Sequence, residues 1–376
     1  MEDSVSEGYD YDHYGLRDTL EDETLNVYLN DSTGRIAERE LNLLVEDIGP
    51  EYDSMADVPG ILDSDVRRGP VIDPSSVTLL GMTHPLVSGD LVSLGRGQAA
   101  WVGTVQNVQG DANRTAVVLY SFKSDGSFTE RLLSNAPVSG DDSDLCTCIR
   151  GEELFVFGAD RESHATSNDV SVFNIVTEEW RTLPHTGVWP QSMHSMESEV
   201  QGNMWYIRGS VQVEGEADSY EAPRLIYGFD MDTHMWTKPF PSGTMLLTSE
   251  PNPSSDRAIY FSWINQLVYS HTSQEGCRLL TKCPSEALVP GLVLDRHVVF
   301  YKRSITGQAA VYCYSLVSGV WYRSDSPLSG YPWRHCLIEP LTALVITYQP
   351  LPDDTTVVRP YLMQLYMPEE EDAVSH

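Results

Sequence analysis

The sequence predicts an all-β fold, a six-bladed β-propeller of four-stranded blades, and two observations carry this prediction. Short apolar or alternating runs recur along the 376 residues and are separated by turn residues, a pattern typical of strands. The runs group in fours, and each group takes about fifty residues, which is the length of one propeller blade. Three groups also share an aromatic residue that is followed seven positions later by a Trp: Phe173 and Trp180, Phe229 and Trp236, and Tyr314 and Trp321.

The clearest copy lies in residues 144–184. Segment 154–157 is fully apolar, and segment 170–173 alternates between apolar and polar residues, as a half-buried strand does. A turn then leads to the short strand 180–183, which Pro184 ends, since proline cannot donate to a strand ladder. With segment 144–149 in front, this copy has four strands.

One four-stranded sheet cannot bury both of its apolar faces by itself, whereas radial stacking of neighbouring sheets buries them. A large aromatic side chain at a fixed place in each copy is expected to pack between one blade and the next. We therefore predict that Trp180, Trp236 and Trp321 are largely buried between blades.

The other copies follow in chain order, and segment 144–183 is blade two. Blade four is irregular in sequence, and blade six has only three strands before the chain becomes acidic. The expected strands are 90–94, 99–105, 115–122 and 127–133 in blade one; 197–200, 203–208, 224–229 and 235–239 in blade three; 245–248, 258–261, 266–269 and 278–280 in blade four; 288–293, 297–301, 309–314 and 320–323 in blade five; and 336–338, 343–347 and 361–366 in blade six.

The missing strand of blade six has one candidate. The acidic run at 369–372 cannot form a buried strand, and an open edge would leave a gap in the ring. Segment 76–82 (SVTLLGM) is the only unassigned strand-like stretch. We predict that it pairs with segment 361–366 and joins the two ends of the propeller, and that residues 1–70 lie outside this closure and are dispensable for folding.

The predicted organisation is an acidic, largely disordered arm (1–74), the propeller (75–367) and an acidic tail (368–376). The arm holds 20 acidic and five basic side chains and few apolar ones. Within it, residues 33–48 could form a short amphipathic helix that ends at Gly49 and Pro50. This helix is either transient or forms in the groove of a partner, and the first interpretation is favoured.

The net charge of −31 argues against nucleic acids and anionic membranes as partners, because both need basic patches. No apolar run follows the first Met, and none is long enough to span a bilayer. We therefore expect a cytoplasmic monomer in which the six cysteines are reduced thiols.

The repeats resemble kelch motifs, in which the second strand ends in a double glycine before a Tyr and a Trp at set distances. Gly158 and Gly209 keep the first glycine, Gly103 is a third match, and blades four to six lack it. Segment 332–336 (PWRHC) is similar to the family's approach to the first strand. The resemblance covers about residues 75–367 and implies a kelch-type propeller. Glycine at this place allows a positive φ or close packing of backbones.

No catalytic or metal-binding constellation is recognised, and no cofactor is expected. Cys146 and Cys148 lie two apart on one expected strand and are interpreted as core residues, since a metal site needs further ligands. His194 and His335 occupy matching blade positions that are structural in the family. Some kelch propellers are enzymes similar to galactose oxidase, with a copper held by tyrosines and histidines, but that arrangement cannot be placed here.

The function expected is that of a non-catalytic protein-interaction module. Five connections between second and third strands should emerge on one rim of the propeller, where propellers of this type bind partners. A metal-dependent or lyase-like enzyme on the same scaffold is the alternative, and a third possibility is that the arm is the active part. The partner is a protein or peptide, and the candidate binding residues are Arg161, Glu162, Tyr220, Arg224, Arg303 and Trp333.

Overall fold

The structure is a computed structural model, and the chain divides into two compact units, Met1–Val58 and Pro59–His376. The residues described here all belong to the second unit, and the helix expected at 33–48 and the acidic tail at 368–376 lie outside them. The described residues are 61, 65–69, 71–106, 114–123, 125–135, 143–160, 169–184, 186–187, 190, 193–211, 224–237, 240–241, 245–246, 258–262, 266–272, 276–285, 288–294, 296–302, 310–326, 328–350 and 356–367.

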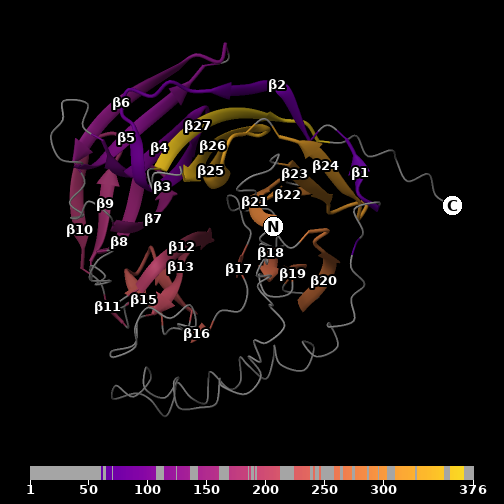
Figure 1. The fold of residues 1–376 in the computed structure, drawn as a ribbon. Helices are drawn as coiled ribbons and strands as arrows, with labels where there is room; N and C mark the ends of the chain where they lie inside the picture. The colour runs from indigo at the N-terminus through magenta and orange to yellow at the C-terminus, as the bar shows by residue number, and fades with distance from the viewer. Residues whose placement is uncertain are drawn as a thin grey trace, which may run out of the picture. The chain divides into compact units, whose positions relative to one another are not determined.

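The described part is an all-β propeller of four-stranded antiparallel blades, as the sequence predicts. Its strands form six sheets, which we number in chain order. In Figure 1 the first strand of each sheet lies toward the middle, and the later strands lie farther out. Sheet 1 is β3 (Leu86–Gly95), β4 (Gln98–Val105), β5 (Arg114–Phe122) and β6 (Phe128–Asn135); sheet 2 is β7 (Ser143–Arg150), β8 (Glu153–Asp160), β9 (Val170–Asn174) and β10 (Glu179–Leu183); sheet 3 is β12 (Met193–Gln201), β13 (Met204–Val211), β14 (Arg224–Asp230) and β15 (Met235–Trp236), with β11 (Thr186–Gly187) beside β15 and β16 (Phe240–Pro241) beside β14.

The remaining sheets continue the same up-and-down order. Sheet 4 is β17 (Met245–Leu246), β18 (Ala258–Ser262), β19 (Leu267–Thr272) and β20 (Gly276–Lys282); sheet 5 is β21 (Leu288–Val293), β22 (His297–Lys302), β23 (Ala310–Ser315) and β24 (Trp321–Asp325), with β1 (Arg67–Arg68) beside β24; sheet 6 is β25 (Tyr331–Glu339), β26 (Thr342–Pro350), β27 (Thr356–Leu365) and β2 (Ile72–Leu79).

Sheet 4 differs from the regular blade that the sequence suggested. Its first strand, β17, has two residues, whereas the first strand of every other sheet has six or more. The sequence that follows β17 contains Pro251 and Pro253 among Ser and Asn residues, and proline cannot donate to a strand ladder. The described structure therefore contains five well-formed blades rather than the six that were expected, with sheet 4 as an incomplete one.

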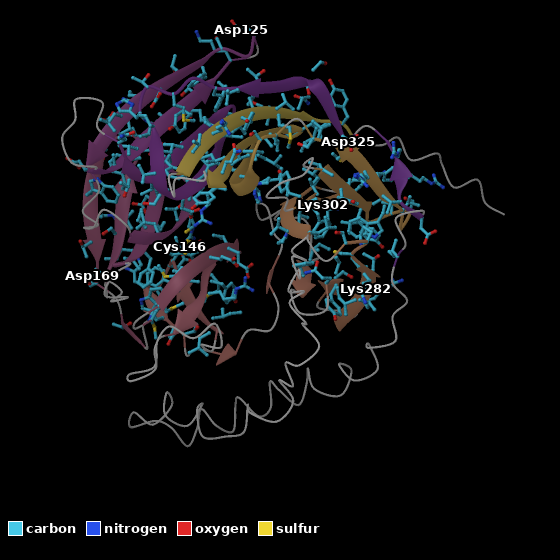
Figure 2. The ribbon with its side chains drawn as sticks, viewed as in Figure 1. Asp125, Cys146, Asp169, Lys282, Lys302 and Asp325 are labelled. Carbon is cyan, nitrogen blue, oxygen red and sulfur yellow. The ribbon has the colours of Figure 1, made fainter. Side chains whose placement is uncertain are left out.

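The hydrophobic core lies between neighbouring sheets. One cluster joins sheets 1 and 6, a second joins sheets 5 and 6, a third joins sheets 4 and 5, and a fourth joins sheets 1 and 2. Sheets 2 and 3 meet through Phe157 and Trp236, whose ring centroids are 5.1 Å apart. Figure 2 shows Cys146 among the packed side chains of sheet 2 and Asp125 at the outer tip of the β5–β6 turn.

The predicted tryptophans contact the preceding blade, but only two are buried. Trp236 and Trp321 are 3% and 2% exposed, and the indole Nε1 of Trp321 donates to Thr281 Oγ1 of sheet 4 at 3.0 Å. Trp180 packs against the cluster of sheets 1 and 2 and is partly exposed, so it is less buried than the other two. The reason is that β10 is an outer strand with mostly exposed neighbours.

Three turns between third and fourth strands repeat one conformation. Asn174 Oδ1, Asp230 Oδ1 and Ser315 Oγ each accept from the backbone N–H groups two and three residues later. The fifth residue of each turn has positive φ: Glu178 at 59°, His234 at 57° and Gly319 at 68°. These turns lie between the aromatic residue and the Trp of each copy, which explains why their spacing is constant.

Gly103 shows why the second strand carries a glycine. A Cβ built there would lie 2.2 Å from the carbonyl oxygen of Ser88 and 2.5 Å from the Cα of Gly89. The glycine is needed because β3 and β4 approach closely at this point.

Inner strands are also joined by polar contacts. Arg334 Nε on β25 lies 3.0 Å from the Gly89 carbonyl and 3.3 Å from Asp90 Oδ1 on β3. Asp90 Oδ2 accepts from the N–H and the hydroxyl of Thr147 on β7, at 2.8 and 2.9 Å. The Arg of the 332–336 motif thus ties the last blade to the first two.

The predicted closure is confirmed. β2 pairs antiparallel with β27 at the outer edge of sheet 6, with Ile72 opposite Leu365, Val77 opposite Met363 and Leu79 opposite Tyr361. The strand begins at Ile72, before the segment that was expected. Backbone hydrogen bonds therefore join the start and the end of this unit.

The prediction that residues 1–70 lie outside the closure is wrong for segment 66–69. Arg67 and Arg68 pair in parallel with Tyr322 and Arg323 of β24, and Ser324 Oγ bridges Gly69 and Val71. Val66 is 9% exposed and belongs to the core cluster of sheets 4 and 5. This short segment was missed because Arg67 and Arg68 carry no hydrophobic pattern.

The loss of stability on replacing each tryptophan should increase with the burial of its side chain. Trp236→Ala and Trp321→Ala are each expected to lower the free energy of unfolding by about 3–5 kcal/mol, and Trp180→Ala by less. Urea unfolding measures the three variants, with Val317→Ala at a 61% exposed position as the control. An equal loss for Trp180→Ala and Trp236→Ala would contradict this ranking.

Three truncations test the closure. A chain that starts at Pro59 should unfold like the full chain, and one that starts at Val71 should be less stable because β1 and the buried Val66 are lost. Burial of one Val side chain contributes about 1.5–3 kcal/mol. A chain that starts at Thr83 loses β2 and should be weakest or aggregate. Urea unfolding gives the order, and equal stability of the last two would rule the closure out.

Candidate functional site

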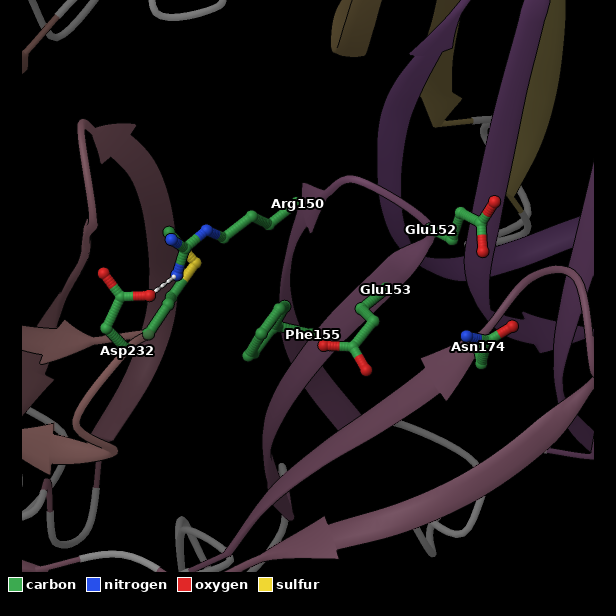
Figure 3. A pocket seen from close by; sticks show the side chains of 7 residues that line it. Arg150, Glu152, Glu153, Phe155, Asn174 and Asp232 are labelled. Atoms are coloured by element: carbon green, nitrogen blue, oxygen red, sulfur yellow. Dashed lines mark ion pairs between the residues drawn. The ribbon is translucent and has the colours of Figure 1, made fainter.

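A cavity of about 480 Å³ opens between sheets 2 and 3, at the ends of their strands (Figure 3). Sheet 2 contributes the β7–β8 turn and the end of β9, and sheet 3 contributes the β14–β15 turn. The residues that line it are Arg150, Glu152, Glu153, Phe155, Asn174, Met231 and Asp232.

Local turn chemistry places these side chains. β7 and β8 are joined by a two-residue turn in which Gly151 has a φ of 62°, a conformation that glycine adopts without strain. This turn puts Arg150 and Glu153 opposite each other on neighbouring strands. On the other side, Asp230 caps the β14–β15 turn and holds Asp232 toward the cavity. The pKa of Asp230 is below its ordinary value because the N–H groups of Asp232 and Thr233 donate to its carboxylate.

Two ion pairs border the cavity. Arg150 reaches from sheet 2 to Asp232 of sheet 3, with 2.6 Å between Nη1 and Oδ1, and this contact raises the pKa of Arg150 (Figure 3). Arg181 lies 2.7 Å from Glu153. Both pairs are about half exposed to solvent, so each contributes little to stability.

The floor of the cavity is apolar. Phe155 is 2% exposed and Met231 is 4% exposed. Beneath them, Cys148 Sγ lies 3.8 Å from Met231 Sδ across the boundary between the two sheets. The cavity therefore combines charged walls with an apolar base.

Arg224 and Trp333, the two predicted binding residues that lie in described strands, are at the opposite end of their sheets. In each antiparallel sheet, the connections between strands one and two and between strands three and four lie at one end, and the connection between strands two and three lies at the other. We call these ends the turn rim and the loop rim. The cavity opens on the turn rim, whereas the candidates were taken from the loop rim or its neighbourhood.

None of the predicted site residues has a described side chain. Arg161, Glu162, Tyr220 and Arg303 lie outside the described residues. Arg224 begins β14, opposite Ser210, and Trp333 lies at an irregularity of β25 between Pro332 and Arg334. Their roles in binding stay a prediction.

The cysteines that the structure describes fit the expected core role. Cys146, Cys148, Cys283, Cys313 and Cys336 are buried reduced thiols, and burial raises the pKa of Cys148. Among the described side chains, no group of three His, Cys, Asp or Glu residues could hold a metal ion. His335 packs against Tyr301 of sheet 5 with ring centroids 5.4 Å apart, and burial lowers its pKa to about 4.

One polar cluster escaped the sequence analysis. Glu197 and Glu199 of β12 pair across strands with Arg208 and Tyr206 of β13, and Arg208 donates to the Glu197 carboxylate. Burial, with a smaller contribution from Glu197, raises the pKa of Glu199 to about 8, although Arg208 acts in the opposite direction. The cluster was missed because segment 196–201 (MESEVQ) is rich in Glu and other polar residues. Such a sequence does not indicate that this face of β12 is buried.

Comparisons with known proteins support the fold. No protein-family model matches the sequence, and no curated protein matches it. The chain is similar to the solved structure of YjhT, with a TM-score of 0.52 and 14% identity over 77% of this chain and 99% of that chain. A protein of unknown function from Dyadobacter fermentans gives a TM-score of 0.49 and 11% identity, over 79% of this chain and 100% of that one.

An acylaminoacyl peptidase from Pyrococcus horikoshii also matches, with a TM-score of 0.41 and 10% identity over 76% of this chain and 46% of that chain. At 14% identity, the likeness to YjhT shows the fold alone. The likeness to YjhT therefore supports a β-propeller and leaves the kelch identity of the repeats unconfirmed.

Glu199 should make stability depend on pH. Its pKa is higher in the folded chain than the ordinary 4.5, so the folded state holds the proton more tightly. The stability that this group contributes is therefore largest below about pH 4.5 and is lost as the pH rises to about 8. In urea unfolding, Glu199→Gln should make the free energy of unfolding depend less on pH between about 4.5 and 8.

The exposed Glu339 of β25 offers a matched control for that profile. Glu339→Gln should leave the pH dependence as it is in the unchanged chain. If Glu199→Gln and Glu339→Gln give the same profile, then Glu199 is not the titrating group.

Proposed function

We propose that this chain is a non-catalytic protein-interaction module, a kelch-type propeller that binds a protein or peptide partner. The observation that carries the proposal is the cavity between sheets 2 and 3, which pairs charged walls with an apolar floor on a rigid scaffold. Such a mixture suits the recognition of side chains. Sheet 4 completes a ring of six blades in this proposal, because it shares a core cluster with sheet 5.

The proposal also covers the partners, the cellular compartment and the oligomeric state of the protein. The net charge of −31 disfavours nucleic acids and anionic membranes as partners. The described part of the chain contains no helix that is long and apolar enough to cross a membrane. The five buried thiols suit a reducing compartment, so we place the protein in the cytoplasm, acting as a monomer.

The loop rim is the first surface to test. The variant Arg161→Glu/Arg224→Glu/Arg303→Glu reverses three charges there and should retain the melting temperature of the unchanged chain, since exposed charges contribute little to stability. The tagged full chain and the tagged variant are each cross-linked to their partners in a cell extract. The variant should capture less of each partner than the full chain does.

The charge reversal Lys123→Glu, at an exposed residue between β5 and β6 on the turn rim of sheet 1, controls for a general effect of charge. Equal capture by the triple variant and the unchanged chain would remove these residues from the binding surface. A large fall in melting temperature would show that they are structural. Absence of any specific partner for the folded chain would contradict the interaction module itself.

A further inference from the structure

Five of the six large exposed apolar side chains among the described residues lie on the turn rim, and Leu79 of β2 is the exception. Val176 is 67% exposed in the β9–β10 turn, and Met235 is 49% exposed at the end of the β14–β15 turn. These two turns form opposite sides of the cavity, since they also carry Asn174 and Asp232. Val317, Leu341 and Tyr366 are exposed at turn-rim ends of other sheets. Large apolar side chains on one rim are typical of a surface that binds a partner.

The charge of the cavity is negative. Glu152, Glu153 and Asp232 supply three carboxylates, against the guanidiniums of Arg150 in the lining and of Arg181 beside Glu153. Glu152 is exposed, and no ion pair is formed by it with any described residue. The Arg150–Asp232 and Arg181–Glu153 pairs are exposed as well, so an incoming cation can replace a partner in them at low cost.

The size and floor of the cavity suit a long basic side chain. A volume of about 480 Å³ holds one Lys or Arg side chain together with part of a neighbouring residue. The methylene groups of such a side chain can pack on Phe155 and Met231 while its charged end reaches the carboxylates. Methionine adapts its shape to different ligands, and a guanidinium is attracted to the face of an aromatic ring.

We propose that this turn-rim cavity is a binding site for a peptide segment of a partner protein that carries Lys or Arg next to an apolar residue. The basic side chain enters between sheets 2 and 3, and the apolar residue lies against Val176 or Met235. This inference rests on the proposed function, and it assigns to the turn rim a site separate from the loop-rim candidates.

A peptide display experiment tests the site with the full-length chain. Random nonapeptides displayed on phage are selected on the unchanged protein, on Glu152→Lys and on Asp325→Lys. Asp325 is a matched control because its side chain is exposed on sheet 5, far from the cavity in the sheet order. The unchanged chain and Asp325→Lys should enrich peptides with Lys or Arg beside an apolar residue, and Glu152→Lys should not.

Fluorescence anisotropy then measures the most enriched peptide. Glu152→Lys should weaken binding about tenfold or more, as expected when an attraction becomes a repulsion, and Asp325→Lys should leave it unchanged. Val176→Asp should weaken binding without a change in melting temperature, because Val176 is exposed. Binding by the unchanged chain should also weaken as salt is raised.

Three results would overturn the site. Enrichment of peptides without Lys or Arg, or binding that Glu152→Lys leaves unchanged, would reject the turn-rim cavity while the interaction module stands. Failure to enrich any peptide would also reject the cavity as a peptide site, and the cross-linking of partners to the full chain would decide the proposed function separately.

Discussion

Burial of both faces of each sheet is the constraint on which this structure depends. A four-stranded sheet exposes two apolar faces, and only a neighbouring sheet on each side can cover them. The core accordingly lies in clusters between sheets rather than within one layer. Aromatic contacts such as Phe157 with Trp236, and the hydrogen bond from Trp321 to Thr281, join consecutive blades in this way.

A ring of sheets needs its two ends joined, and this chain uses its N-terminal side for that purpose twice. β2 supplies the outer strand of sheet 6, and β1 extends sheet 5 by a parallel pairing. Parallel addition also occurs at sheet 3, where β11 lies beside β15. Linking segments thus cover the outer edges of sheets, which are otherwise open to pairing with another chain.

The same architecture gives the molecule two rims with different chemistry. Short turns with side-chain caps form the turn rim, and they place charged residues at fixed positions around the cavity of sheets 2 and 3. The sequence analysis had directed attention to the loop rim, because the connections between second and third strands gather there and propellers of this type bind partners there. A short, capped turn can hold a binding residue more rigidly than a long loop does.

The sequence by itself determined the class of fold, the repeat and the closing strand. Alternation of apolar and polar residues, turn residues and the spacing of Phe229 and Trp236 are local patterns in the sequence, so they could be interpreted without the structure. Tertiary structure decided the rest. The partial exposure of Trp180, the pairing of Arg67 and Arg68 with β24, and the short β17 depend on what lies beside each segment. The cavity is formed by residues from two sheets, and Arg150 and Asp232 are 82 positions apart, so no local pattern could join them. Contacts between sheets arise only after the chain has stacked its blades, which is why the sequence predicted the scaffold and the structure located the site.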